Sequence, residues 1–196
     1  MDDIKTHPKT SSIGSICVYC GASDNVNAIY IRLAEALGRE LAERGIRLVY
    51  GGGGVGLMGA CARAANGAGG SVLGIMPRFL LQKERIFKDV EHRIVEDMHT
   101  RKMMMFEEAD AFIVLPGGIG TLEEAVEILS WARLGLHAKP MAFLDEDGFW
   151  KPFFDLIDRI IAGGFIPETF RDALVHSATP DAAITALEDR RVVIDL

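Results

Sequence analysis

Short apolar runs alternate with amphipathic segments along nearly the whole chain, and this alternation restricts the possible folds more than any other feature. Apolar runs bounded by turn residues predict strands, and apolar residues three and four apart predict helices. The predicted strands lie at 13–23, 46–50, 71–76, 92–96, 111–115, 139–145 and just after 173. The predicted helices lie at 28–45, 56–66, 100–109, 121–134, 149–164 and just before 190. Such alternation is typical of successive βαβ units.

Successive βαβ units form an open parallel sheet with helices on both faces. We therefore predict an α/β protein with a doubly wound, Rossmann-like sheet. A chain of 196 residues suffices for one sizeable core and not for two. Residues 1–12 are predicted to be a loose N-terminal tail and residues 13–196 a single domain. The strand at 111–115, "AFIVL", is apolar throughout, so both of its faces are expected to be buried.

The charge balance argues against a nucleic-acid partner. The net charge is -7 and the isoelectric point is near 5.2, whereas phosphate backbones need clustered Lys and Arg. The start, Met1-Asp2-Asp3, has neither a basic signal-peptide region nor an apolar one. The apolar runs are too short to cross a bilayer. We expect a soluble, cytoplasmic protein without a membrane partner.

The cysteines and histidines do not predict a redox or metal site. Cys17 and Cys20 form a C-x-x-C, but residues three apart on a strand point to opposite faces, so the two thiols should diverge. Cys61 lies in an Ala-rich predicted helix, and all three cysteines are expected in the core. Four of the five histidines, at positions 92, 99, 137 and 176, are scattered along the predicted domain, and no metal is expected.

Four unusual segments directly follow predicted strands. These are "CGAS" after the first strand, "GGGGVG" after the second, "DMHTRK" after the fourth and "PGGIGT" after the fifth. Ligands of open α/β sheets bind outside the carboxyl ends of the strands. We therefore expect these four turns to converge on one crevice.

The second turn matches a dinucleotide fingerprint only weakly. Gly51, Gly53 and Gly56 satisfy G-x-G-x-x-G, but a run of four glycines matches many patterns. The motif follows the second strand instead of the first, and no acid after the next strand is placed to hold a ribose hydroxyl. An NAD(P) site is not favoured, and neither glycine turn continues into the G-K-[S/T] of a P-loop.

Three further glycines, Gly117, Gly118 and Gly120, interrupt an apolar run just before the helix predicted at 121–134. The unpaired N–H groups and the dipole of a helix N-terminus bind anions such as phosphate, if no side chain holds the anion away. The structural alternative is a tight turn that needs positive φ.

Two carboxylates, Glu123 and Glu124, open the same helix. Thr121 and Glu124 fit a capping box, with Thr121 as the N-cap and Glu124 at the third position, which is the structural explanation. The functional one is that a carboxylate one turn from a phosphate cradle can activate water or stabilise a cation. Arg101 and Lys102 would supply complementary charge, although cations at a helix N-terminus oppose its dipole.

The segment "PGGIGTLEE" fits the P-G-G-x-G-T-x-x-E signature of the LOG family, the cytokinin riboside 5′-monophosphate phosphoribohydrolases. "YGGGGVGLMG", "DMHTRK" and "WARLGLHAKP" are also similar to that family's pattern, in the same order and spacing. The resemblance covers roughly residues 13 to 165. Members have often been labelled lysine decarboxylases, but pyridoxal chemistry needs a Schiff-base lysine with a partner for the pyridinium nitrogen. Nothing in the sequence singles one out, and no cofactor is expected.

The resemblance implies a nucleotide-binding domain that hydrolyses the N-glycosidic bond of a nucleoside 5′-monophosphate, giving free base and ribose 5-phosphate. Arg101 and Glu124 match the catalytic pair. The phosphate would be held by Gly117, Gly118, Gly120 and Thr121, and the ribose hydroxyls by Glu123. The other implied substrate positions are Ser23, Gly53, Glu84, Met98, Lys102 and Ser130. Ala22 departs from the family, in which many relatives carry serine.

Three functions remain open. Cleavage of a ribosyl bond builds an oxocarbenium-like cation, which carboxylates such as Glu124 stabilise or serve by activating water. An AMP nucleosidase without cytokinin preference is the first alternative, because an isopentenyl pocket would be merely apolar. A non-enzymatic nucleotide or cofactor carrier is the second, since fold alone does not exclude it. Arg101 together with Glu124 favours the enzyme, because a carrier needs the cradle and not the carboxylate.

A homodimer is also predicted. The segment at 123–136 is apolar on more than one face, with Trp131, Leu134 and Leu136 outside its core stripe. A helix that is apolar around its circumference is buried on more than one side. Symmetric dimers are the commonest way to bury such a surface, and the family resemblance implies one as well.

Overall fold

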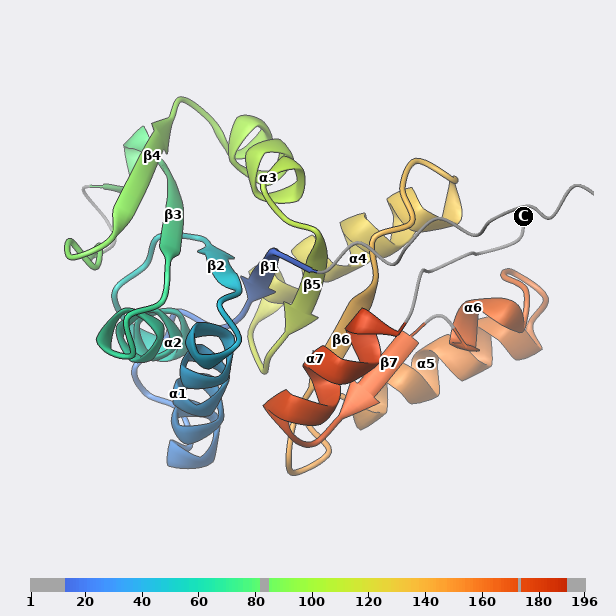
Figure 1. The fold of residues 1–196 in the computed structure, drawn as a ribbon. Helices are drawn as coiled ribbons and strands as arrows, with labels where there is room; N and C mark the ends of the chain where they lie inside the picture. Colours follow the sequence, from blue (N-terminus) through green and yellow to red (C-terminus); the bar gives the residue numbers. More distant parts are fainter. Residues whose placement is uncertain (1–12, 82–84, 173, 190–196) are drawn as a thin grey trace, which may run out of the picture.

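Seven parallel strands form one twisted sheet in the order β4-β3-β2-β1-β5-β6-β7 (Figure 1). The computed structural model describes residues 13–81, 85–172 and 174–189. The strands are β1 (Ser15–Tyr19), β2 (Arg47–Tyr50), β3 (Val72–Pro77), β4 (Glu91–Val95), β5 (Ala111–Val114), β6 (Met141–Leu144) and β7 (Leu174–Ser177). The helices are α1 (Ala28–Glu43), α2 (Gly56–Gly67), α3 (Met98–Glu107), α4 (Ile119–Arg133), α5 (Lys151–Ala162), α6 (Thr169–Asp172) and α7 (Pro180–Glu188), with a short 3-10 helix at Arg78–Leu80. The predicted α/β class is confirmed.

The strand order changes direction at β1. The chain builds outward from β1 through β2 and β3 to β4, then returns so that β5 pairs with the free edge of β1. Ile16 of β1 therefore lies between Leu48 of β2 and Ala111 of β5. The connections after β1 and β5 leave the sheet in opposite directions, which opens a crevice at the carboxyl ends of these two strands.

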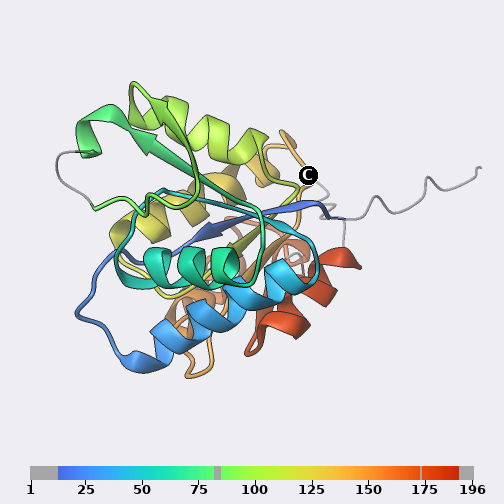
Figure 2. The ribbon, with the colours of Figure 1, turned by 60° about the vertical axis from the view of Figure 1, so that its left-hand side comes forward.

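Helices cover both faces of the sheet (Figure 2). The buried side chains of α1, α2 and α7 form one core cluster, and those of α3, α4, α5 and α6 form the other. Successive residues of β1 alternate between the two cores, as strand geometry requires. Cys17 and Cys20 accordingly lie in opposite clusters and Cys61 is buried, and all three are free thiols, as predicted.

Local caps explain where the helices begin. Asn27 Oδ1 accepts a hydrogen bond from Ile29 N at the start of α1, and Asp97 Oδ1 accepts one from Thr100 N at the start of α3. The Asp97 cap places the first residue of α3 at Met98, two residues before the predicted start at 100. The short helix α6 was not predicted.

The start of α4 corrects the predicted capping box. The N-cap is Gly118, and no side chain caps this end of the helix. Thr121 is the third helical residue and Glu124 the sixth, so neither can play its part in a capping box at this end. The capping explanation for Glu124 is wrong, because the glycines at 118 and 120 let the helix begin earlier than the first good capping residue.

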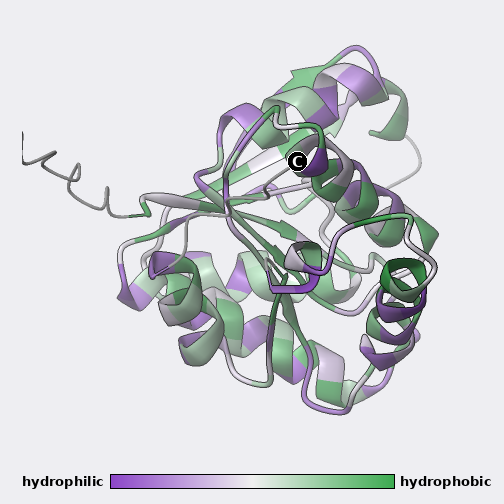
Figure 3. Ribbon diagram, turned by 90° about the vertical axis from the view of Figure 1, so that its right-hand side faces the viewer, coloured by the Kyte–Doolittle hydropathy of each residue, from purple (hydrophilic) through white to green (hydrophobic). Residues whose placement is uncertain are grey.

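The interior of the sheet is apolar and the outer helix surfaces are mixed (Figure 3). The residues of β5 are fully buried on both faces, as expected for "AFIVL". No helix in the described part of the chain is long and apolar enough to span a membrane.

Candidate functional site

The glycine-rich turn after β5 carries an open helix N-terminus. A Cβ added at Gly118 or Gly120 would meet no atom within 4 Å, whereas one at Gly117 would overlap Thr121 Oγ1. None of these three glycines has a positive φ, so the turn explanation that required it is wrong. Gly117 is needed for packing against buried Thr121. Gly118 and Gly120 leave free space in front of the first N–H groups of α4, where an anion can approach them.

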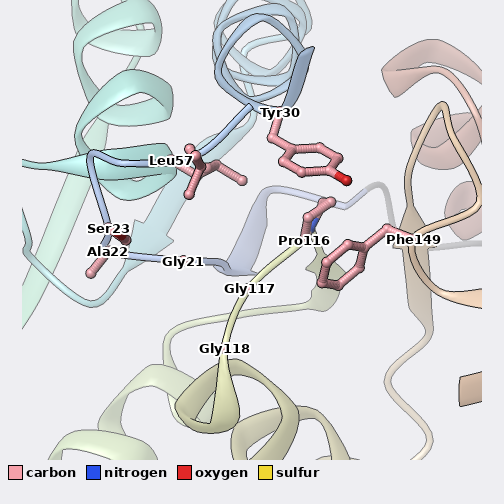
Figure 4. Close-up of a pocket in the computed structure, with 10 residues that line it drawn as sticks. Gly21, Ala22, Ser23, Tyr30, Leu57, Pro116, Gly117, Gly118 and Phe149 are labelled. Atoms are coloured by element: carbon pink, nitrogen blue, oxygen red, sulfur yellow. The ribbon is translucent and has the colours of Figure 1, made fainter. Parts of the chain in front are cut away.

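A pocket of about 550 Å³ lies at the point where the strand order reverses (Figure 4). The turn after β1 and the turn after β5 meet in it, and Gly21 N donates to Pro116 O across 3.1 Å. The rings of Tyr30 and Phe149 approach each other edge to face, 5.6 Å between centroids. The pocket is lined by Gly21, Ala22, Ser23, Val26, Tyr30, Leu57, Pro116, Gly117, Gly118 and Phe149. Its walls are therefore apolar, and one side opens onto the start of α4.

The glycine run after β2 does not offer a second anion site. The N–H of Gly56 donates to Asp24 Oδ1 at 2.8 Å, and those of Leu57 and Met58 donate to Gly21 O at 3.0 and 3.3 Å. The start of α2 is thus closed by the turn after β1. These N–H groups are therefore not free to bind the pyrophosphate of NAD(P), for which the sequence fingerprint was only weak.

Arg101 projects from the first turn of α3 toward the carboxyl ends of the strands. Its side chain is buried, with Nε 3.2 Å from Ile75 O and Nη2 3.2 Å from Gly51 O. These carbonyls belong to β3 and to the turn after β2, so segments 26 and 50 residues away fix the guanidinium. No carboxylate of the described residues forms a salt bridge with it, and a buried cation without such a partner is a candidate site for an anionic ligand.

Glu124 is buried beside this cation on α4. Desolvation raises the pKa of its carboxyl to about 7, although Arg101 and Lys102 act in the opposite direction. The neighbouring carboxylates Glu123 and Glu127 raise the pKa further. A carboxyl that changes protonation near neutral pH is suited to general acid–base chemistry.

Lys102 joins α3 to α4. Its Nζ lies 2.6 Å from Glu123 Oε1 and 2.9 Å from Glu127 Oε1. Together with the buried Arg101 and Glu124, these residues form a cluster of two cations and three carboxylates beside the phosphate cradle, the open N-terminus of α4 at Gly118 to Thr121. The complementary charge predicted from Lys102 is thus present as contacts with α4, whereas Arg101 acts on Glu124 electrostatically without a salt bridge.

The remaining predicted positions lie around this cluster or apart from it. Met98 is half-buried, with its sulfur 3.9 Å from Arg101 Nη1. Ser23 is exposed at the pocket, and Gly53 pairs as an isolated bridge with Ile86. Ser130 is exposed on α4, further along the helix than Glu127. Glu84 falls outside the described residues.

Several residues of the site were not predicted from the sequence. Glu127 carries a recognisable signal, since it lies four residues after Glu123 on the same helix face. Tyr30 and Phe149 carry none, because nothing in the chain relates α1 to the segment after β6. Gly51 was noted only as part of a fingerprint, whereas its role is to leave room for Arg101.

Fold and site together define a doubly wound α/β protein with an open helix N-terminus at its switch point and with a buried arginine, Arg101, that acts electrostatically on a buried glutamate, Glu124. A family model described as "Possible lysine decarboxylase" matches residues 58–187. The chain is 45% identical over 182 residues to the "Cytokinin riboside 5'-monophosphate phosphoribohydrolase LOG" of Oryza sativa subsp. japonica, covering 92% of this chain and 75% of that protein. It is 43% identical over 180 residues to the phosphoribohydrolase LOG3 of Arabidopsis thaliana, covering 91% and 84%. The chain belongs to the LOG family.

Solved structures with the same fold include proteins of another kind. A molybdenum cofactor binding protein from Rippkaea orientalis has a TM-score of 0.67 at 20% identity, covering 89% of this chain and 95% of that one. The molybdenum cofactor carrier protein of Chlamydomonas reinhardtii has a TM-score of 0.66 at 21% identity, covering 89% and 95%. At this identity the likeness concerns the fold alone.

Proposed function

We propose that this protein hydrolyses the N-glycosidic bond of a nucleoside 5′-monophosphate, releasing the free base and ribose 5-phosphate. The observation that carries the proposal is the position of Glu124, buried next to Arg101 with its pKa raised to about 7, six residues into the helix whose N-terminus is open. The names of the LOG relatives in rice and Arabidopsis support the same reaction.

The substrate is held from the phosphate end. The 5′-phosphate binds the N–H groups at Gly118 to Thr121, where free space and the helix dipole favour an anion. Gly117 keeps the turn close to Thr121, and Glu123 accepts hydrogen bonds from the ribose hydroxyls. Ser23, Gly53, Glu84, Met98, Lys102 and Ser130 are the further substrate contacts that the family motif assigns.

Glu124 and Arg101 then act on the glycosidic bond. The base departs with the bonding electrons and takes up a proton from solvent, which leaves positive charge on the ribose ring. An ionised Glu124 stabilises this charge and accepts a proton from the attacking water, whose oxygen forms the new bond to the ribose. Arg101 keeps part of the Glu124 population ionised by lowering its pKa against the effect of burial. Because carbonyls of Ile75 and Gly51 fix the guanidinium, this charge is in place before the substrate arrives.

Decarboxylation through a pyridoxal cofactor fits these residues poorly. Schiff-base lysines need a lowered pKa so that the amine is neutral and nucleophilic. Partial burial lowers the pKa of Lys102, but its hydrogen bonds to Glu123 and Glu127 outweigh this and raise it above the ordinary value. The lysine of this site is therefore held as a cation.

A carrier role is the weaker candidate. The structural neighbours named for a molybdenum cofactor are about 20% identical to this chain, whereas the phosphoribohydrolases are about 45% identical. A carrier would also have no use for a buried carboxyl that titrates near neutral pH. Between cytokinin and adenine as the preferred base, the cytokinin riboside 5′-monophosphates are favoured by the relatives' names alone.

The test is direct. The purified protein is incubated separately with AMP and with isopentenyladenosine monophosphate, and released base and ribose 5-phosphate are quantified. Release from either substrate, lost in Glu124→Gln, is the expected result. Binding of both nucleotides without release of base from either would instead favour the carrier.

A further inference from the structure

The Lys102 ammonium is shared unequally by two carboxylates of α4. Its own side chain is 16% exposed, that of Glu127 is 24% exposed and that of Glu123 is 52% exposed. Glu123 lies nearer to the cradle, since α4 begins at Ile119, and Glu127 lies one helical turn further along. The ammonium therefore has one sheltered partner and one partner open to solvent and to the substrate.

The three charges depend on one another. Two like charges at i and i+4 on a helix repel, and the ammonium between Glu123 and Glu127 offsets this repulsion. Lys102 directly follows Arg101 on α3, and Glu123 directly precedes Glu124 on α4. The contact of Lys102 with Glu123 and Glu127 therefore joins α3 to α4 next to Arg101 and Glu124.

We infer that Glu127 is a positioning residue for glycosidic cleavage. When the substrate binds, Glu123 releases the Lys102 ammonium and accepts hydrogen bonds from the ribose hydroxyls instead. Glu127 keeps its contact with Lys102 and so holds the ammonium next to the substrate. The inference rests on the proposed function, in which Glu123 binds the ribose. Lysine carries three N–H donors, so it can keep Glu127 while a substrate oxygen replaces Glu123. Without Glu127, a substrate that takes Glu123 would leave a largely buried ammonium without a carboxylate.

Glu127 also influences the charge state of Glu124. The charged groups that face Glu124 are Arg101 and Lys102 from α3 and Glu123 and Glu127 from its own helix. Cys17, Tyr19 and Cys20, on β1 or directly after it, also interact with Glu124, and burial raises the pKa of all three, so they are neutral. Since Glu127 raises the pKa of Glu124, its removal moves the ionisation of Glu124 to lower pH.

The structural alternative is that Glu127 only ties α3 to α4. In that case its loss would lower thermal stability and leave the substrate affinity and pH dependence of the active fraction unchanged. A matched tie exists at the other end of α3, where Glu108 binds Arg47 at 2.5 Å and also Arg93. Glu108 lies at the opposite end of α3 from Lys102, so Glu108→Gln is the control for losing an ion pair that attaches α3 to the rest of the protein.

The experiment compares the wild type, Glu127→Gln, Glu127→Asp and Glu108→Gln. For Glu127→Gln we expect KM for the nucleotide to rise about tenfold, the loss that one charge-assisted contact represents. We also expect the acid limb of its pH profile of kcat/KM, which reflects the ionisation of Glu124, to move to lower pH. Glu127→Asp keeps the charge and should leave that limb near its wild-type position. Glu108→Gln should alter the melting temperature only.

The outcomes separate this inference from the proposed function. If the wild type releases no base from any nucleotide, the proposed function fails, and the inference is then judged by the affinity for AMP in calorimetry. Weaker AMP binding by Glu127→Gln than by Glu108→Gln then supports only the part of the inference by which Glu127 holds Lys102 at the bound nucleotide. A Glu127→Gln variant with wild-type affinity and an unmoved acid limb would overturn it and make the contact a structural tie.

Discussion

Gly51 and Arg101 share one small volume, because a Cβ on Gly51 would overlap Nη2 of the Arg101 guanidinium. The carbonyl of the same glycine accepts a hydrogen bond from that nitrogen. A glycine in the turn after β2 is thus required by a side chain that arrives from α3, fifty residues later. Gly51 itself has no positive φ, so the requirement is one of space and not of backbone conformation.

Gly51→Ala should displace Arg101 and reduce activity without unfolding the protein. We expect kcat/KM to fall roughly 10- to 100-fold, the range that the loss of one charged contact produces. Gly67→Ala is the control, since a Cβ on that helical glycine meets no atom within 4 Å. Steady-state kinetics and thermal melting of both variants provide the measurement. Full activity in Gly51→Ala would mean that the position of Arg101 does not matter.

Glu124→Gln should lower kcat by orders of magnitude while nucleotide still binds, if the carboxylate acts in the transition state. Gln has nearly the same shape and no charge, and Glu124 has no capping task that Gln could take over. In the wild type, kcat/KM should fall below about pH 7, as the Glu124 carboxylate is protonated. Turnover of the variant comparable to the wild type would exclude the catalytic role.

The same buried carboxyl predicts how stability depends on pH. The pKa of Glu124 is raised to about 7 in the folded protein, against about 4.3 in an unfolded chain. Between these values the native state binds a proton that the unfolded chain has lost. The free energy of unfolding therefore decreases as pH rises through this window, by up to about 4 kcal/mol from this group.

Glu124→Gln abolishes this contribution. Relative to the wild type, the variant should gain stability as pH rises from about 4.5 to 7, and keep the gain above that range. Urea denaturation of both proteins at several pH values is the measurement. Two parallel stability curves would show that Glu124 does not titrate in this window.

The 5′-phosphate should contribute to turnover as well as to affinity. If the N–H groups at the start of α4 hold it, AMP is cleaved far faster than adenosine, since binding of a remote group positions the ribose for attack. Gly118→Val places a side chain in the free space at the cradle, at a φ of -91° that valine can adopt. It should reduce kcat/KM for AMP at least about tenfold and leave that for adenosine nearly unchanged. Equal wild-type values for AMP and adenosine would contradict the cradle.

The predicted homodimer can be tested on α4 and the turn that follows it. Leu134 and Leu136 are 64% and 67% exposed, and Val126 is 46% exposed. Trp131 contributes less than expected, because it is half-buried and packs edge to face on Phe106. We expect light scattering to give twice the chain mass of 21.4 kDa, and Leu134→Glu with Leu136→Glu to give monomers. A monomeric wild type at micromolar concentration would remove this prediction.

The sequence alone determined the class of fold and the edge of the sheet at which the site lies. The alternation of strands and helices is a local pattern, since it follows from spacing within single elements. The position of the site follows from topology, because every parallel strand ends at the same edge. The motifs at 97–102 and 116–124 also pointed to Arg101 and Glu124, respectively, before any contact was visible.

Only the tertiary structure decided what these residues do for one another. The sequence offered a capping box at Thr121, but α4 begins at Ile119 after the N-cap Gly118, so Glu124 lies buried inside the helix. The pairing of Gly51 with Arg101 and of Lys102 with Glu127 joins separate elements, and no spacing within one element encodes it. Hydrophobic periodicity reports which side of an element faces the core, whereas the contacts that tune a charged site depend on how the elements pack together.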